Sequence, residues 1–332
     1  MTAMTVVAPA FNEAGVLPAF HARLAAVLEA LPLDCRVLYV DDGSSDGSWD
    51  IIAGLAAADR RVTGLRLSRN FGKEAALTAG LDHVDATADA VVVIDSDLQD
   101  PPELIPRLVE EWRAGHDVVY ATRSTRSGET AFKRFTAAAF YRLMARVSDT
   151  AIPRDTGDFR LLSRRALLAL RQLPERQRFM KGLFAWIGFD QVGVHYQREA
   201  RAGGRSKWNY WRLAQLAVEG LTSFSAAPLR LATWAGLTTS LLAFAFGVWV
   251  LVKALIWGDP VAGYPSLMIV ILFLGGMQLL ALGVIGEYIA RTYAESKQRP
   301  LYYIEQQVGG PADTGGEAIQ PPRVHARPAA DA

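Results

Sequence analysis

The sequence has few of the residues that mark several common classes of protein. Its 332 residues include a single cysteine, Cys35, which excludes an intrachain disulfide framework and a cysteine-rich zinc site. The formal net charge is only +1, so no overall field points to nucleic acid, and we expect no such partner. Residues 1–5 contain neither a basic stretch nor the apolar core of a signal peptide, and we therefore expect the N-terminal domain to stay in the cytoplasm.

Charge is also scarce in two long apolar runs near the C-terminal end. Residues 234–257 carry one charge, Lys253, and residues 266–286 carry none. As helices both runs would be about 30 Å long or longer, enough to cross a bilayer, although two buried core helices are the alternative. We predict transmembrane helices at 234–257 and 266–288. Basic residues flank both runs, and the turn between them has no Lys or Arg, so the positive-inside rule places both termini in the cytoplasm.

The N-terminal half alternates short apolar segments with amphipathic ones. This alternation favours an α/β fold with a doubly wound, Rossmann-like, largely parallel sheet, whose ligands bind at the carboxyl ends of the strands. The predicted strands are 5–8, 36–40, 62–67, 90–94 and 117–121, and the predicted helices between the first four are 14–30, 48–58 and 73–84.

The predicted domain organisation places one catalytic domain before the membrane. We expect an interfacial amphipathic helix after that domain, with an ordinary core helix as the alternative, and a disordered tail because the end of the chain is rich in Pro, Gly and Ala. The predicted segments are a cytoplasmic catalytic domain at 1–207, a juxtamembrane amphipathic helix at 208–230, transmembrane helices at 234–257 and 266–288, a non-cytoplasmic turn at 258–265, a cytoplasmic juxtamembrane segment at 289–308 and a disordered tail at 309–332.

An acidic segment, DSDLQDPPE at 95–103, directly follows the apolar run 91–94. Carboxylates that share one cleft repel each other, and a divalent cation commonly relieves that repulsion. Oxygen ligands suit Mg²⁺ or Mn²⁺, which typically carry the phosphates of a substrate. A solvated acidic loop is the alternative for this segment on its own.

Two further polar segments end predicted strands: PAFNE at 9–13 and VDDGSSDGS at 40–48. Together with DSDLQDPPE, in this order, they resemble the family-2 glycosyltransferases of GT-A fold. The segments TGDFRLL at 156–162 and GGRSKW at 203–208, with the paired C-terminal runs, resemble the polyprenyl-phosphate glycosyltransferases. This resemblance covers about residues 4–305 and is strongest to the dolichol-phosphate-mannose-synthase-like group, in particular the bactoprenol glucosyltransferases.

The resemblance implies a metal-dependent enzyme that is anchored in the inner membrane and crosses it more than once. Such an enzyme transfers one hexose from a nucleotide sugar, with UDP-glucose the first choice, to polyprenyl (undecaprenyl) phosphate with inversion. It also implies Mg²⁺ or Mn²⁺, a homo-oligomer such as a tetramer, and a flippase that takes the product for cell-envelope glycan or lipid modification. GDP-mannose, UDP-GlcNAc and a UDP-aminoarabinose remain alternative donors.

The same resemblance implies roles for particular residues. The implied nucleotide-sugar site comprises Pro9, Asn12, Glu13, Asp41, Asp42, Lys73 and Asp95, and the implied metal ligands are Asp97, Gln99 and Asp95. The implied catalytic residues are Asp97, Asp158 and Arg123, and the implied lipid-phosphate site comprises Arg123, Arg134, Arg205 and Lys207. Because the acceptor phosphate is already anionic near neutral pH, it needs cations to position it more than a base to deprotonate it.

Two other functions compete with this prediction. A processive polysaccharide synthase of the same superfamily usually carries Gln-x-x-Arg-Trp and more spans, and the segment beginning at Gln177 does not supply that pattern. A non-catalytic membrane accessory of lipid-sugar flipping would not need the acidic segments, and the two apolar runs contain no acid that could form a pathway.

Overall fold

The computed structural model describes residues 2–123, 156–176, 178–196, 227–257 and 263–310. The chain divides into two compact units. The first unit contains the described residues up to 196 and those from 299 onward. The second contains two long helices, α9 (Ala227–Trp257) and α10 (Tyr264–Ser296).

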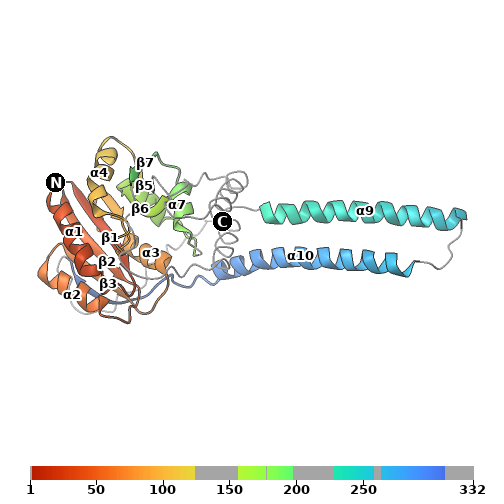
Figure 1. Cartoon of the computed structure of the whole chain (residues 1–332), viewed down its shortest axis with the longest axis horizontal. Helices are drawn as coiled ribbons and strands as arrows, with labels where there is room; N and C mark the ends of the chain where they lie inside the picture. Colours follow the sequence, from red (N-terminus) through yellow and green to blue (C-terminus); the bar gives the residue numbers. More distant parts are fainter. Residues whose placement is uncertain (1, 124–155, 177, 197–226, 258–262, 311–332) are drawn as a thin grey trace, which may run out of the picture. The chain divides into compact units, whose positions relative to one another are not determined.

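The first unit is built on an eight-stranded mixed sheet in the order β7-β5-β6-β4-β1-β2-β3-β8 (Figure 1). Its strands are β1 (Ala3–Ala10), β2 (Asp34–Asp41), β3 (Val62–Leu67), β4 (Ala90–Val93), β5 (Val118–Arg123), β6 (Thr156–Ser163), β7 (Gln191–Tyr196) and β8 (Ile304–Gly309). The four strands β4-β1-β2-β3 are parallel, as the alternating sequence pattern predicts. The strand order reverses between β1 and β4, and such a switch point is where open α/β sheets bind ligands.

The helices of this unit connect and cover the strands. They are α1 (Leu17–Glu29), α2 (Ser48–Ala58), α3 (Lys73–His83), the 3₁₀ turn η1 (Pro102–Leu104), α4 (Ile105–Arg113), α6 (Arg164–Arg171) and α7 (Met180–Trp186). Central strands such as β4, whose residues Ala90 to Val93 are all buried, read as continuous apolar runs because helices cover both faces of the sheet. The large side chains of Phe20 and Tyr39 complete the core between α1 and β2.

Two strands correct the sequence prediction of a largely parallel sheet. β6 lies between β4 and β5 and is antiparallel to both, whereas the sequence predicted only a ligand segment there. β8 is antiparallel to β3 and lies in the segment predicted to be a juxtamembrane connection. Its last residue, Gly309, also lies inside the predicted disordered tail. A pattern of apolar residues predicts that a strand forms but not which strand it pairs with, so these neighbours were missed.

The second unit contains α9 and α10, which lie side by side (Figure 1). Among the described residues, one segment is long and apolar enough to cross a membrane, Phe273–Ser296, and its apolar window is entirely unburied. This segment overlaps the predicted span at 266–288, and α10 as a whole contains that span. In α9, one continuous helix over Ala227–Trp257, the described apolar stretch is Ala232–Phe246, and the span at 234–257 stays a prediction. Residues 208–226, 258–262 and 311–332, on which three predicted segments largely fall, lie outside the described residues.

Candidate active site

The carboxyl ends of β1, β2 and β4 lie at one edge of the sheet because these strands are parallel. After β4, the buried Ser96 hydroxyl donates a hydrogen bond to the Pro9 carbonyl of β1 at 2.9 Å. Pro9 in turn lies opposite Val40 of β2 in the parallel register. The backbone at Pro9 therefore fixes the acidic segment against the switch point of the sheet.

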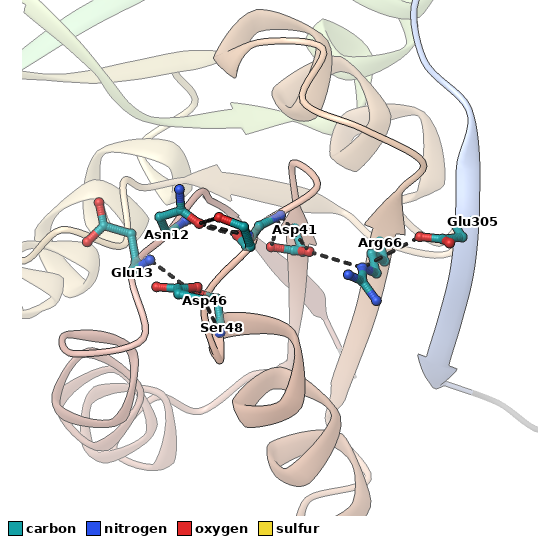
Figure 2. Close-up of polar contacts among 9 residues, drawn as sticks. Asn12, Glu13, Asp41, Asp46, Ser48, Arg66 and Glu305 are labelled. Carbon is teal, nitrogen blue, oxygen red and sulfur yellow. Dashed lines mark hydrogen bonds and ion pairs between the residues drawn. The ribbon is translucent and has the colours of Figure 1, made fainter.

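The loops after β1 and β2 are joined by hydrogen bonds between backbone and side chains (Figure 2). The Asn12 N–H donates to Ser44 Oγ, and the Glu13 N–H donates to Ser48 Oγ, both at 2.9 Å. The Asn12 side-chain oxygen accepts from the Ser45 N–H at 2.9 Å, and Asn12 has a φ of 57°, which Asn tolerates better than most residues. The hydrogen bonds of Asn12 therefore hold the two predicted nucleotide-binding loops together.

Asp41 and Asp42 at the end of β2 are both buried. Asp42 accepts from the N–H groups of Phe71 at 2.7 Å and Gly72 at 2.9 Å, so it holds the loop before α3. Asp41 accepts from the Ser44 N–H at 3.3 Å. Burial raises the pKa of both carboxyls, and these hydrogen bonds oppose the rise. Asp42 therefore connects the end of β2 to the loop that leads into Lys73.

The Lys73 ammonium bridges two carboxylates that come from different strands. Its Nζ lies 2.7 Å from Asp95 Oδ2, after β4, and 2.6 Å from Asp158 Oδ2, in β6. Burial would raise the pKa of Asp158, but the charges of Lys73 and Lys181 outweigh it and hold that pKa at about 2. Burial raises the pKa of Asp95 against the attraction of Lys73. Asp158 is therefore an ionised group at neutral pH, and its buried Oδ1 has no hydrogen-bond partner among the described residues.

Glu74, next to Lys73, is a carboxyl beside the candidate site that the sequence prediction did not single out. Burial, followed by the charge of Asp158, raises the pKa of Glu74 to about 7. The Met180 N–H at the start of α7 donates to Glu74 Oε2 at 3.3 Å. A Lys-Glu pair directly after a glycine was visible in the sequence, but nothing in it indicated which carboxyl would be buried.

The acidic segment contains a tight turn that brings backbone toward Asp97. The Gln99 N–H donates to Asp97 Oδ1 at 3.1 Å, and Leu98 between them has a φ of 59°. A non-glycine residue at such a φ carries strain of about 1–3 kcal/mol, which is often found at functional sites. Among the described residues no three His, Cys, Asp or Glu side chains form a ready metal cage. Mg²⁺ is usually bound by one or two carboxylates plus substrate phosphates, and Asp95 and Asp97 fit that kind of site.

The sequence matches two family models, one in each half of the chain. Residues 5–171 match the family described as Glycosyl transferase family 2, and residues 227–292 match the GtrB C-terminal hairpin. The chain belongs to glycosyl transferase family 2. The α/β sheet with its acidic segments at the switch point is accordingly a GT-A-like catalytic unit, and the predicted resemblance is confirmed.

Two relatives resemble this transferase over nearly its whole length. An uncharacterized glycosyltransferase, sll0501, from Synechocystis is 48% identical over 92% of this chain and 96% of its own. The bactoprenol glucosyl transferase of Shigella phage SfV is 47% identical over 92% of this chain and 98% of its own. Among solved structures, glucosyl-3-phosphoglycerate synthase from Mycobacterium tuberculosis is 21% identical, with a TM-score of 0.44, over 67% of this chain and 78% of its own.

The cationic residues predicted to bind lipid phosphate are the least described part of the transferase. Arg123 is the last residue of β5 and lies opposite Tyr196 of β7 in register. Arg134, Arg205 and Lys207 lie outside the described residues. Their roles, like those of the other predicted site residues, stay predictions.

Proposed function

We propose that this transferase moves one glucose from UDP-glucose to undecaprenyl phosphate at the cytoplasmic face of the inner membrane. The observation that carries the proposal is the similarity to the bactoprenol glucosyl transferase of Shigella phage SfV, which extends over 92% of this chain and so includes both the catalytic unit and the helical hairpin. The product would be a lipid-linked sugar for modification of cell-envelope glycans or lipids.

The donor site would lie along the carboxyl ends of β2 and β4. Asp41 would accept hydrogen bonds from the nucleoside, and Asp42 would hold the loop that carries Lys73. Asp95 would lie near the ribose, and Lys73 beside it is a cation that can attract the donor diphosphate.

A Mg²⁺ or Mn²⁺ ion would be held by Asp97, with Asp95 and Gln99. When bound, this cation would stabilise the charge that develops on the departing nucleoside diphosphate. The turn at Leu98 keeps Asp97 bonded to the Gln99 N–H, so the carboxylate is oriented before the donor arrives. An ion held by two carboxylates and an amide leaves positions for phosphate oxygens.

The acceptor would react through an oxygen of its phosphate. That oxygen would bond to the anomeric carbon on the face opposite the diphosphate, the bond from that carbon to the diphosphate would break, and the configuration would invert. Asp158, with a pKa of about 2 and an ion pair to Lys73, is a weak base, which favours a positioning role. Its buried Oδ1, which has no partner among the described residues, would accept a hydrogen bond from a sugar hydroxyl. Arg123 would bind the acceptor phosphate, together with Arg134, Arg205 and Lys207.

The helical hairpin would anchor the enzyme. Large apolar side chains on both helices are exposed, among them Phe244 at 73% and Leu279 at 72%, and lipid would cover such surface. We propose that α9 crosses the membrane together with α10, with both termini in the cytoplasm. The tetramer and the flippase partner that the resemblance implies stay predictions.

The full-length protein in detergent or nanodiscs can test this proposal. It is incubated with Mn²⁺, undecaprenyl phosphate and radiolabelled UDP-glucose, UDP-GlcNAc, UDP-aminoarabinose or GDP-mannose in turn. We expect label from UDP-glucose in a butanol-soluble lipid, loss of transfer with EDTA, and an inverted anomeric configuration by NMR. Asp97→Asn should reduce transfer by about 100-fold or more, whereas the matched variant Asp34→Asn, at the opposite end of β2, should leave transfer unchanged.

Other outcomes would redirect or reject the proposal. Label from a different donor would show that the nucleotide sugar was chosen wrongly. Label that appears only in polymer would favour a processive synthase. Absence of transfer from every donor in membranes that contain the intact protein would leave a non-catalytic accessory role, and full transfer after removal of all divalent cations would reject the metal.

A further inference from the structure

The C-terminal strand β8 is an integral part of the catalytic unit. After α10 the chain returns to pair antiparallel with β3, with Gln306 opposite Arg66. Just before the strand, the buried Tyr302 hydroxyl donates to Asp82 of α3 at 3.0 Å. The Ser68 N–H donates to the Tyr303 carbonyl at 2.9 Å, beyond the end of β3. These contacts fix the position of the next charged residue, Glu305.

Arg66 lies between the carboxylates of Asp41 and Glu305, as Figure 2 shows. Its Nε is 3.7 Å from Asp41 Oδ2 and 3.6 Å from Glu305 Oε2. Both distances are too long for hydrogen bonds, and this buried Nε has no hydrogen-bond partner within the described parts of the chain. The guanidinium lies 5.9 Å from the ring centroid of Trp49. The carboxylates of Asp41 and Glu305 therefore attract Arg66 from two sides, while its Nε–H donates no hydrogen bond to the described residues.

Arg66 differs from its partner Asp41 in exposure. The Asp41 side chain is fully buried, whereas the Arg66 side chain next to it is 30% exposed. Arg66 is therefore the exposed member of this pair, and a base placed against the end of β2 would meet its guanidinium beside the Asp41 carboxylate. A carboxylate accepts and a guanidinium donates, which together match the imide edge of uracil, where one N–H lies between two carbonyl oxygens. Cytosine, whose N3 carries no hydrogen, offers no such edge.

We propose that β8 completes the donor site: Arg66 contacts the base of the nucleotide beside Asp41, and Glu305 is the positioning residue that holds Arg66 there. The inference rests on the proposed function, because it takes Asp41 to bind the nucleoside. It makes a strand that follows the membrane hairpin responsible for nucleotide affinity and for the choice of base.

The test measures binding of UDP and CDP to the full-length protein by calorimetry, with the thermal midpoint of each variant as a check on folding. Glu305→Gln should weaken UDP binding about 3-fold, as expected for a partly exposed ion pair. Arg66→Met should weaken it about 10-fold and reduce the preference for UDP over CDP. Glu305→Gln should have no further effect in the Arg66→Met background, because Glu305 acts through Arg66. Arg66→Lys, which keeps the charge, should retain most of the affinity.

The matched control is Glu29→Gln. Glu29 also shares an arginine with a second carboxylate, since Arg61 lies 3.2 Å from Glu29 and 2.7 Å from Asp59. Arg61 precedes β3 at the end of the strand opposite Arg66, so this variant should leave UDP binding unchanged. An unchanged UDP affinity in folded Glu305→Gln and Arg66→Met would overturn the inference, as would an equal effect of Glu29→Gln. A wild type that binds GDP and not UDP would instead reject the proposed donor, and the same variants would then decide the inference with GDP.

Discussion

Replacing Lys73 by methionine would test the central ion pairs of the site. Lys73 places one positive charge 2.7 Å from Asp95 and 2.6 Å from Asp158. Methionine keeps much of the length of the side chain but removes the charge, so both carboxylates lose their shared cation. Asp158, whose side chain is only 9% exposed, is the carboxylate least able to recover that interaction from water.

The size of the effect follows from the burial of the three groups. Removing one partner of a fully buried ion pair costs about 3–5 kcal/mol. The Lys73 side chain is 45% exposed, so solvent screening reduces the expected cost to about 1–3 kcal/mol. For a catalytic unit of this size, such a loss lowers the thermal midpoint by about 3–10 °C.

The assay is thermal unfolding of the full-length protein at pH 8, with Lys297→Met, at the exposed end of α10, as the control substitution. Lys73→Arg keeps the charge and should lose less stability. Adding Asp158→Asn to Lys73→Met should restore much of the loss, because the buried charge that has lost its ion pair with Lys73 is then gone. A Lys73→Met protein that unfolds at the wild-type temperature would refute the reasoning, and so would a double variant less stable than the single one.

Three further predictions concern neighbouring groups. Asp97→Asn should abolish Mn²⁺ binding seen by electron paramagnetic resonance and reduce transfer by about 100-fold or more. Its thermal midpoint should equal that of the control variant Asp34→Asn. The pKa of Glu74 is raised from 4.5 to about 7, so between these pH values the folded state binds a proton that the unfolded state has lost, and the free energy of unfolding falls as pH rises from 4.5 through 7. Glu74→Gln should have the same free energy of unfolding as wild type at pH 4.5 and one about 3 kcal/mol higher at pH 8. Equal stabilities at pH 8 would contradict this prediction. Asp42→Ala removes the acceptor of two backbone N–H groups and should cost about 2–4 kcal/mol, with faster amide hydrogen exchange at Phe71 and Gly72; unchanged exchange there would refute the role of Asp42.

Much of the parallel half of the sheet could be predicted because its signals are local. Each of β1 to β4 is a short apolar run followed by a turn or an acidic segment, and the helices between them have their own periodicity. The carboxyl ends of parallel strands meet at one edge, so Asp41, Asp42 and Asp95 could be assigned to that edge before their contacts were known. The predicted boundaries of α2, α3 and β3 agree with the structure to within one residue.

The pairings between distant segments could not be predicted in the same way. The sequence by itself determined the parallel strands, the acidic segments at their ends and the apolar C-terminal runs, since each depends on neighbouring residues. Only the tertiary structure decided that β6 enters the sheet and carries Asp158 to Lys73, and that β8 returns to bring Glu305 to Arg66. The physical reason is that hydrogen bonds between strands and ion pairs between loops depend on which segments meet in space, and composition and periodicity within a segment do not encode its partner.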